Sequence, residues 1–177
     1  MPLPIAHGVV GAGIVAVSRP KSSLSADWRM LLLGAALAII PDFDFLLIWV
    51  FHLDSEWHRS FTHSIPMGFI VAALAMGLLG IARIREALTY AAAFMSHGIL
   101  DFLTTKQGGG VELFWPFTHE RLKLGMISFS ELTHGITLLE GLRVSLIELS
   151  LCVPLLLALL LVREFVSSNW RSSQGAT

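Results

Sequence analysis

Long apolar segments, separated by short polar links, make up most of this chain. They cover roughly residues 3–17, 30–51, 65–82, 87–104 and 144–162. An apolar run of about 20 residues is typical of a helix that crosses a lipid bilayer. The pattern therefore predicts an all-α fold, a polytopic helical membrane bundle with about five hydrophobic segments.

The second apolar segment is interrupted by the sequence Pro41-Asp42-Phe43-Asp44. Proline lacks a backbone N–H and disfavours helical geometry at the preceding residue, here Ile40. We therefore expect this helix to be broken between Pro41 and Asp44. A break at membrane depth is tolerated only where it is buried in protein or faces a wet cavity.

The chain is short enough for one domain. We assign residues 1–166 to a single integral membrane domain and the Ser-rich residues 167–177 to a flexible C-terminal tail. The longest polar stretch is 105–143. In it, the aromatic run at 114–117 is typical of an interface anchor, and the spacing of apolar residues over 128–139 predicts an amphipathic helix at the membrane surface.

Composition supports a membrane protein and excludes several other classes. The chain is 54% hydrophobic and 14% charged, whereas soluble domains are about 25% charged. Its net charge of -1 argues against a broad basic surface for nucleic acid, so no nucleic-acid partner is expected. The single cysteine, Cys152, excludes an internal disulfide and a thiolate-rich zinc site.

Basic residues in the links predict the orientation of the bundle. They are Arg19, Lys21 and Arg29, then Arg83 and Arg85, and finally Arg163 and Arg171. Positive links face the cytoplasm, so we expect an inner (cytoplasmic) membrane protein. The remaining polar clusters would then converge at the outward-facing end.

The stretch from His97 to Asp101 carries the clearest candidate chemistry. Residues four apart share one face of a helix, so this imidazole and carboxylate could grip one metal ion or simply bond each other. Further candidate ligands are His7, Asp42, Asp44, His58 and His63, with His119, Glu131 and His134 as weaker additions. Nitrogen and carboxylate ligands without thiolates suit catalytic zinc, with manganese or iron as alternatives. Arg59 could hold a phosphate oxygen.

The order of these residues resembles a known family. The matching positions are His7, Pro41-Asp42-Phe43-Asp44, His58-Arg59, His63-Ser64, His97, Asp101, Thr104, Gly110 and Trp115-Pro116-Phe117. Over roughly residues 5–117 they resemble the YdjM-like (LexA-regulated) membrane-bound metal-dependent hydrolases. The ligand order is also similar to that of the zinc-dependent phospholipase C and nuclease group.

This resemblance implies a metal site and a reaction. By position, the metal ligands would be His7, Asp42 or Asp44, His63, His97 and Asp101. One to three divalent ions are expected. The soluble group continues with a His-x-x-x-Glu pair, but here His134 is followed four residues later by Leu138, so the ligands of a third ion stay open.

The sequence thus predicts an integral membrane hydrolase that cleaves a phosphoester bond in a lipid or lipid-linked substrate. Asp44 or His58 would accept a proton from the attacking water, and Arg59 would hold the anion. Two other interpretations fit the same residues. The cluster could be the binding site of a metal or ion transporter, or a polar lock in a non-catalytic membrane scaffold.

Overall fold

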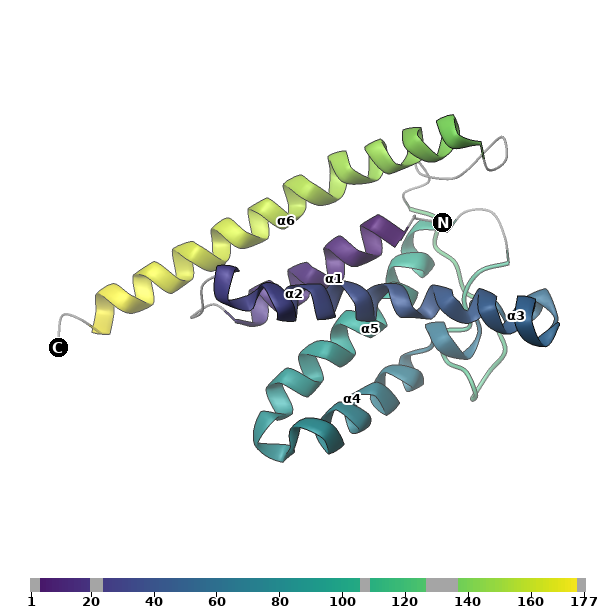
Figure 1. Cartoon of the computed structure of the whole chain (residues 1–177), viewed down its shortest axis with the longest axis horizontal. Coiled ribbons are helices and arrows are strands. Elements are labelled where there is room, and N and C mark those ends of the chain that lie inside the picture. Colours follow the sequence, from purple (N-terminus) through teal and green to yellow (C-terminus); the bar gives the residue numbers. More distant parts are fainter. Residues whose placement is uncertain (1–3, 20–23, 106–108, 127–136, 175–177) are drawn as a thin grey trace.

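The computed structural model describes residues 4–19, 24–105, 109–126 and 137–174. Six α-helices and four short 3-10 helices (η) account for most of these residues, with no strand among them (Figure 1). In order they are α1 Pro4–Ser18, α2 Leu24–Ile39, η1 Ile40–Asp44, α3 Phe45–Phe51, η2 Ser55–Trp57, η3 Phe61–His63, α4 Ile65–Leu79, η4 Ile81–Arg83, α5 Ile84–Thr104 and α6 Leu138–Gln174. The predicted all-α helical bundle is confirmed.

The predicted number of membrane spans is wrong. Among the described residues, two helical stretches, Asp27–Phe51 and Leu142–Phe165, are long and apolar enough to cross a membrane. A third is added if Ser55–His63 and Ile65–Leu79, which meet at a 52° bend, form one span. The helix α1 is apolar but has only 15 residues, and α5 is interrupted by polar groups. The bundle therefore has about three spans rather than five.

Pro41 changes the geometry of its helix without ending it. The proline occupies the start of η1, where the chain tightens into a 3-10 turn, and the helix resumes as α3. The whole stretch still counts as one continuous span, and α2 and α3 run almost in line (Figure 1). The expected break is thus a local tightening that turns Asp42 and Asp44 toward different surroundings.

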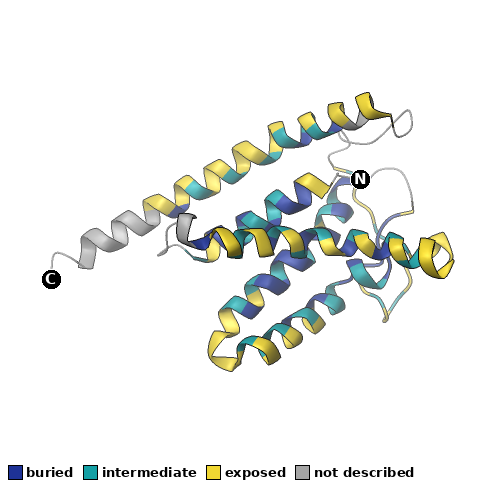
Figure 2. Ribbon diagram, in the orientation of Figure 1, coloured by how far each residue is buried: buried dark blue, intermediate teal, exposed yellow. Residues whose placement is uncertain are grey.

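The helix α1 lies at the centre, packed against α2, α5 and α6, while α4 packs against α5. Its buried face includes His7. In Figure 2 the buried residues follow the inner faces of α1 and α5, and the part of α6 whose burial is described is mostly exposed. Two glycines set the closest approaches. A methyl group at Gly11 would lie 2.3 Å from the carbonyl oxygen of Gly34 in α2, so these helices touch through their backbones.

Gly98 in α5 allows a similar close backbone contact, with His63 in η3. A methyl group there would lie 2.0 Å from the carbonyl oxygen of His63. Only glycine allows η3 to rest directly on α5 at this level.

The loop 109–126 covers one end of the bundle. A β-bridge joins Val111 to Leu122, and backbone hydrogen bonds tie the loop to Ile65 at the start of α4 and to Phe102 near the end of α5. The aromatic run at 114–117 lies in this loop, with Phe117 83% exposed.

Two predicted segments lie near the C-terminus. Most of the expected amphipathic helix over 128–139 lies outside the described residues, since 127–136 are not among them. The helix α6 continues to Gln174, so helical backbone covers most of the segment predicted as a flexible tail.

Candidate metal centre

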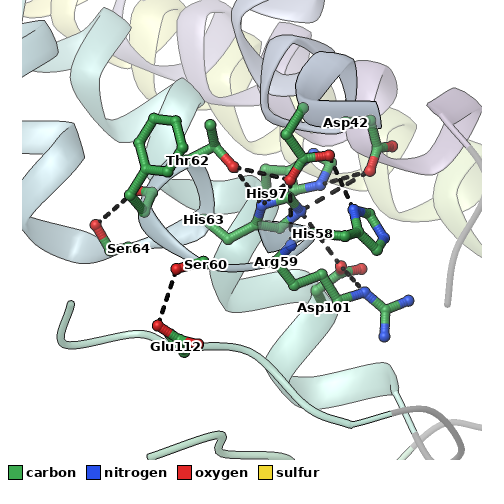
Figure 3. A network of polar contacts seen from close by, with 12 residues as sticks. Asp42, His58, Arg59, Ser60, Thr62, His63, Ser64, His97, Asp101 and Glu112 are labelled. Carbon is green, nitrogen blue, oxygen red and sulfur yellow. Dashed lines mark hydrogen bonds and ion pairs between the residues drawn. The ribbon is translucent and has the colours of Figure 1, made fainter. Parts of the chain in front are cut away.

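Five polar side chains from four helical elements meet at one point inside the bundle. They are His7 from α1, Asp42 from η1, His63 from η3, and His97 and Asp101 from α5. We call them the ligand cluster. Four of the side chains are fully buried, and Asp42 is 11% exposed. Figure 3 shows Asp42, His63, His97 and Asp101 pointing toward one another, with His97 and Asp101 on the same helix.

The geometry of the ligand cluster consists of two overlapping triads. His7, His97 and Asp101 form one, Asp42, His63 and His97 form the other, and in each the ligand atoms lie within 4.8 Å of one another. His97 Nε2 lies 3.3 Å from Asp42 Oδ1, and His7 Nε2 lies 3.5 Å from Asp101 Oδ1. His63 links the triads, because its Nε2 is 3.8 Å from Asp42 Oδ1 and 3.7 Å from Asp101 Oδ2.

Hydrogen bonds outside the cluster orient two of the imidazoles. His97 Nδ1 lies 2.6 Å from the carbonyl oxygen of Ala38, which can only accept, so we assign the ring proton to Nδ1. His63 Nδ1 lies 2.9 Å from the hydroxyl of Thr62, which donates to Asp44 at 3.0 Å. Both rings therefore present an Nε2 lone pair to the cluster, as metal-bound histidines do.

The buried polar atoms of the cluster lack hydrogen-bond partners within the described part of the chain. They are both ring nitrogens of His7, both carboxylate oxygens of Asp42 and of Asp101, and Nε2 of His63 and of His97. Burying such groups without partners costs several kcal/mol, and native proteins rarely leave them so. A divalent cation would satisfy the lone pairs among them, since it binds both imidazole nitrogens and carboxylate oxygens.

The donor set also suggests how many ions fit. His97 belongs to both triads, but its Nδ1 contacts Ala38, so only Nε2 is available, with a single lone pair. The two triads therefore cannot be filled independently through this ring. The residues present fit one ion shared by ligands from both triads, with zinc, manganese or iron(II) as suitable metals.

Asp44 and His58 lie beside the ligand cluster and bind each other. The Asp44 carboxylate accepts hydrogen bonds from His58 Nδ1 at 2.8 Å, from the Arg59 backbone N–H at 3.1 Å and from Thr62 at 3.0 Å. Among the described residues Asp44 belongs to neither triad. Between the two aspartates, the geometry thus favours Asp42 as the ligand and gives Asp44 the role of holding the loop that carries His58 and His63.

Arg59 brings a positive charge to the edge of the cluster. Its Nε lies 3.3 Å from Asp101 Oδ2, and its side chain is 9% exposed. The backbone at Arg59 has φ +62°, a conformation uncommon outside glycine. This turn lets the two ends of Arg59 reach different partners: its backbone N–H donates to Asp44, and its guanidinium lies beside Asp101.

A second polar network supports this loop from outside. Glu112, in the covering loop, accepts a hydrogen bond from Ser60 Oγ at 2.9 Å (Figure 3). It also pairs with Arg121 at 3.2 Å. Arg121 also donates to the backbone oxygens of His58 and Glu56. Neither Glu112 nor Thr62 was identified from the sequence, since no spacing pattern connects either to the histidines.

The weaker candidates do not enlarge the cluster. His119 is largely exposed and contacts Glu112 at 3.3 Å, away from both triads. Glu131 and His134 lie outside the described residues. Ser64, part of the matching motif, caps α4 by accepting a hydrogen bond from the Met67 N–H.

The fold and site define a class: a helical integral membrane protein with a buried cluster of histidines and aspartates. The sequence model of the YdjM inner membrane protein family matches residues 1–171, and the chain belongs to that family. It is 35% identical over 99 residues to the inner membrane protein YbcI of Escherichia coli (strain K12). That alignment covers 52% of this chain and 57% of the relative, so the chain matches little more than half of that protein's length. No solved structure gave a significant match.

These comparisons confirm two sequence-based predictions. The family resemblance holds, and together with the apolar helices it supports an integral protein of the inner membrane.

Proposed function

We propose that this protein is a metal-dependent hydrolase that cleaves a phosphoester bond in a membrane lipid or lipid-linked substrate. The observation that carries the proposal is the convergence of five ligand residues, four of them fully buried, whose ring nitrogens and carboxylate oxygens at the centre have no hydrogen-bond partner within the described chain. A purely structural cluster is expected to satisfy its own polar groups. This one instead leaves them directed at a common centre.

The ion would be held by His7, Asp42, His63, His97 and Asp101. In such a site a divalent metal makes water nucleophilic near neutral pH and polarises the phosphoryl oxygen. Zinc suits the mixture of nitrogen and carboxylate ligands, and manganese or iron would also fit.

His58 is the residue placed to move a proton. Its Nδ1 is fixed by Asp44 at 2.8 Å, so Nε2 carries the available lone pair. The ring is 16% exposed and stacks on Phe45 with centroids 4.0 Å apart, which holds it at the edge of the cluster. In this arrangement His58 accepts the proton of the attacking water, while Asp44 orients the ring and stabilises its charged form.

Arg59 is the residue placed to bind the anion. Its guanidinium reaches the cluster edge beside Asp101, where a phosphate group would compete for its donors. A cation at this position would offset the negative charge that develops on the phosphoryl oxygens during hydrolysis.

The proposal also assigns the face of the membrane. Arg19 and Arg163 lie together at the end of the bundle opposite the ligand cluster. Because positive residues mark the cytoplasmic side, the cluster would face outward from the inner membrane.

A comparison of two variants tests the reaction. The Asp101→Ala protein should lose both its bound metal, measured by elemental analysis, and its hydrolysis of a phospholipid panel. The His58→Gln protein should keep its metal but lose hydrolysis by about 100-fold or more. Hydrolysis that persists in metal-free Asp101→Ala would contradict the proposal. Metal uptake into proteoliposomes without any hydrolysis would favour the transporter interpretation instead.

A further inference from the structure

Four charged side chains mark one boundary of the membrane domain. Arg19 follows α1, Asp27 begins the first span, Glu86 is near the start of α5 and Arg163 is near the end of the second span. Arg19 lies 3.0 Å from Asp27 and 3.7 Å from Glu86, and Arg163 lies 3.9 Å from Asp27. We call these residues the charged belt. Since charges are expensive in hydrocarbon, the belt places all four helices at a common boundary.

The height of the ligand cluster above the charged belt can be estimated along three helices. Eleven residues separate Glu86 from His97, twelve separate Arg19 from His7 and fifteen separate Asp27 from Asp42. At 1.5 Å per residue these are heights of about 16, 18 and 22 Å, against a hydrocarbon core of about 30 Å. Any tilt of the helices only lowers the heights. Three helices thus independently place the cluster below the far boundary of the core, by about 8 to 14 Å.

The helix α3, on the side of the cluster away from the charged belt, supports the same depth. The first span continues past Asp44 through α3, Phe45–Phe51, which is entirely apolar and has no buried residue. These seven residues add about 10 Å. Trp49 is 70% exposed, as expected for a side chain that faces lipid rather than water. Apolar surface of this kind is stable only where hydrocarbon covers it.

The accessible edge of the cluster adjoins this apolar surface. Asp42 of the cluster and the neighbouring His58 and Arg59 are partly exposed, whereas the other four cluster side chains are fully buried. Their chain neighbours Phe43 and Trp57 are both exposed. A ligand arriving at this edge therefore passes apolar side chains.

We infer that the ligand cluster lies inside the bilayer, about 10 Å below its outer boundary, and that its substrate is a phosphorylated amphiphile arriving sideways from the lipid. The depth stands on the geometry alone, whereas the substrate class rests on the proposed function. A water-soluble phosphoester lacks the hydrocarbon chain that would carry it to this depth.

Spin labels in reconstituted vesicles test the depth without any assay of activity. In a Cys152→Ser background, labels would be attached to Leu46→Cys, two residues past Asp44, to Leu32→Cys in the same span and to Phe117→Cys in the covering loop. All three positions are exposed. We expect the Leu46 label to behave like the Leu32 label. Oxygen should relax both labels efficiently, and a water-soluble nickel chelate should relax both several-fold less. A Leu46 label as accessible to the chelate as Phe117 would overturn the inference.

A matched pair of substrates tests the route. A diacyl phosphodiester in vesicles and the corresponding water-soluble glycerophosphodiester share the scissile bond and headgroup. We expect the diacyl form to be hydrolysed at least 100-fold faster at equal concentration. Equal rates would refute sideways entry and leave the hydrolase intact. If neither is cut, the proposed function and its substrate fall together, while the spin labels still decide the depth.

Discussion

The two ends of this bundle share α5 but arrange their polar side chains in opposite ways. In the charged belt, opposite charges face each other, with Arg19 and Arg163 both close to Asp27. In the ligand cluster, carboxylates face the lone pairs of imidazoles, and the polar atoms lack hydrogen-bond partners within the described chain. In the belt, each charged group thus lies beside a charge of opposite sign. In the cluster, under the proposed function, a bound cation would supply the missing partner.

This difference separates structural from functional burial. A buried ion pair that is well matched contributes to holding helices together, and removing one partner is costly. A buried group left unsatisfied lowers stability by itself, so it persists where a bound ligand compensates for it. The two ends should therefore respond differently to substitution and to metal.

The largest effect is expected for metal binding in His97→Ala. His97 is the shared member of both triads, so its loss should weaken metal affinity by more than about 100-fold, beyond the effect of supporting residues. Chelator competition and elemental analysis would measure it. The matched control is His119→Ala, an exposed histidine outside the cluster, which should retain the metal. Equal loss in both variants would contradict the assignment.

The second effect concerns the charged belt. Asp27→Asn removes the buried carboxylate that lies 3.0 Å from Arg19 and 3.9 Å from Arg163, and it should lower the free energy of unfolding by about 3 kcal/mol. Thermal unfolding in detergent, with and without metal, would measure it. The loss should be the same in both conditions, since the belt does not contact the cluster. A metal-dependent loss would erase the distinction between the two ends.

The third effect concerns the contact between α5 and η3. Gly98→Ala places a methyl group 2.0 Å from the His63 carbonyl, so η3 must move, at a cost of about 2 kcal/mol together with weaker metal binding. Gly77→Ala is the control, because a methyl group there meets nothing within 4 Å in the described structure and should stabilise α4 slightly. Unchanged metal affinity in Gly98→Ala would show that His63 does not depend on this contact.

The smallest effect has the opposite sign to the second. In metal-free protein, Asp42→Asn removes a buried carboxylate whose oxygens lack hydrogen-bond partners in the described chain. It should raise the free energy of unfolding by about 1 kcal/mol. In the presence of metal the same variant should be less stable than the parent, since a ligand is gone. Destabilisation in both conditions would mean that Asp42 acts as the belt residues do.

Much of the fold could be predicted because its signals are local. The helices α4 and α5 begin and end within a few residues of the predicted segments, since apolar runs and the intervening turn are written directly in the chain. The span count could not be predicted in this way. The helix α1 is apolar but short, and α5 carries buried polar groups, so apolar character alone did not distinguish crossing the membrane from lying within the bundle.

The residues of the site likewise fall into two groups, those that local spacing predicts and those that depend on the folded structure. The pairing of His97 with Asp101 follows from helical periodicity, and the structure brings both to the ligand cluster. The choice between Asp42 and Asp44 depends on the 3-10 turn after Ile39, which rotates neighbouring carboxylates to different partners. The contribution of Thr62 requires knowing that it bridges His63 and Asp44, a relation that exists only in three dimensions.

The helix α6 supplies no residue to the ligand cluster. Among the described residues, the whole ligand cluster lies between positions 7 and 101, and α6 meets the other helices chiefly through α1. The span in α6 thus anchors the protein without supplying a residue to the cluster, whereas the first span supplies Asp42. A protein engineer could redesign the lipid-facing side of α6, or fuse a reporter beyond it, without touching the residues that form the centre.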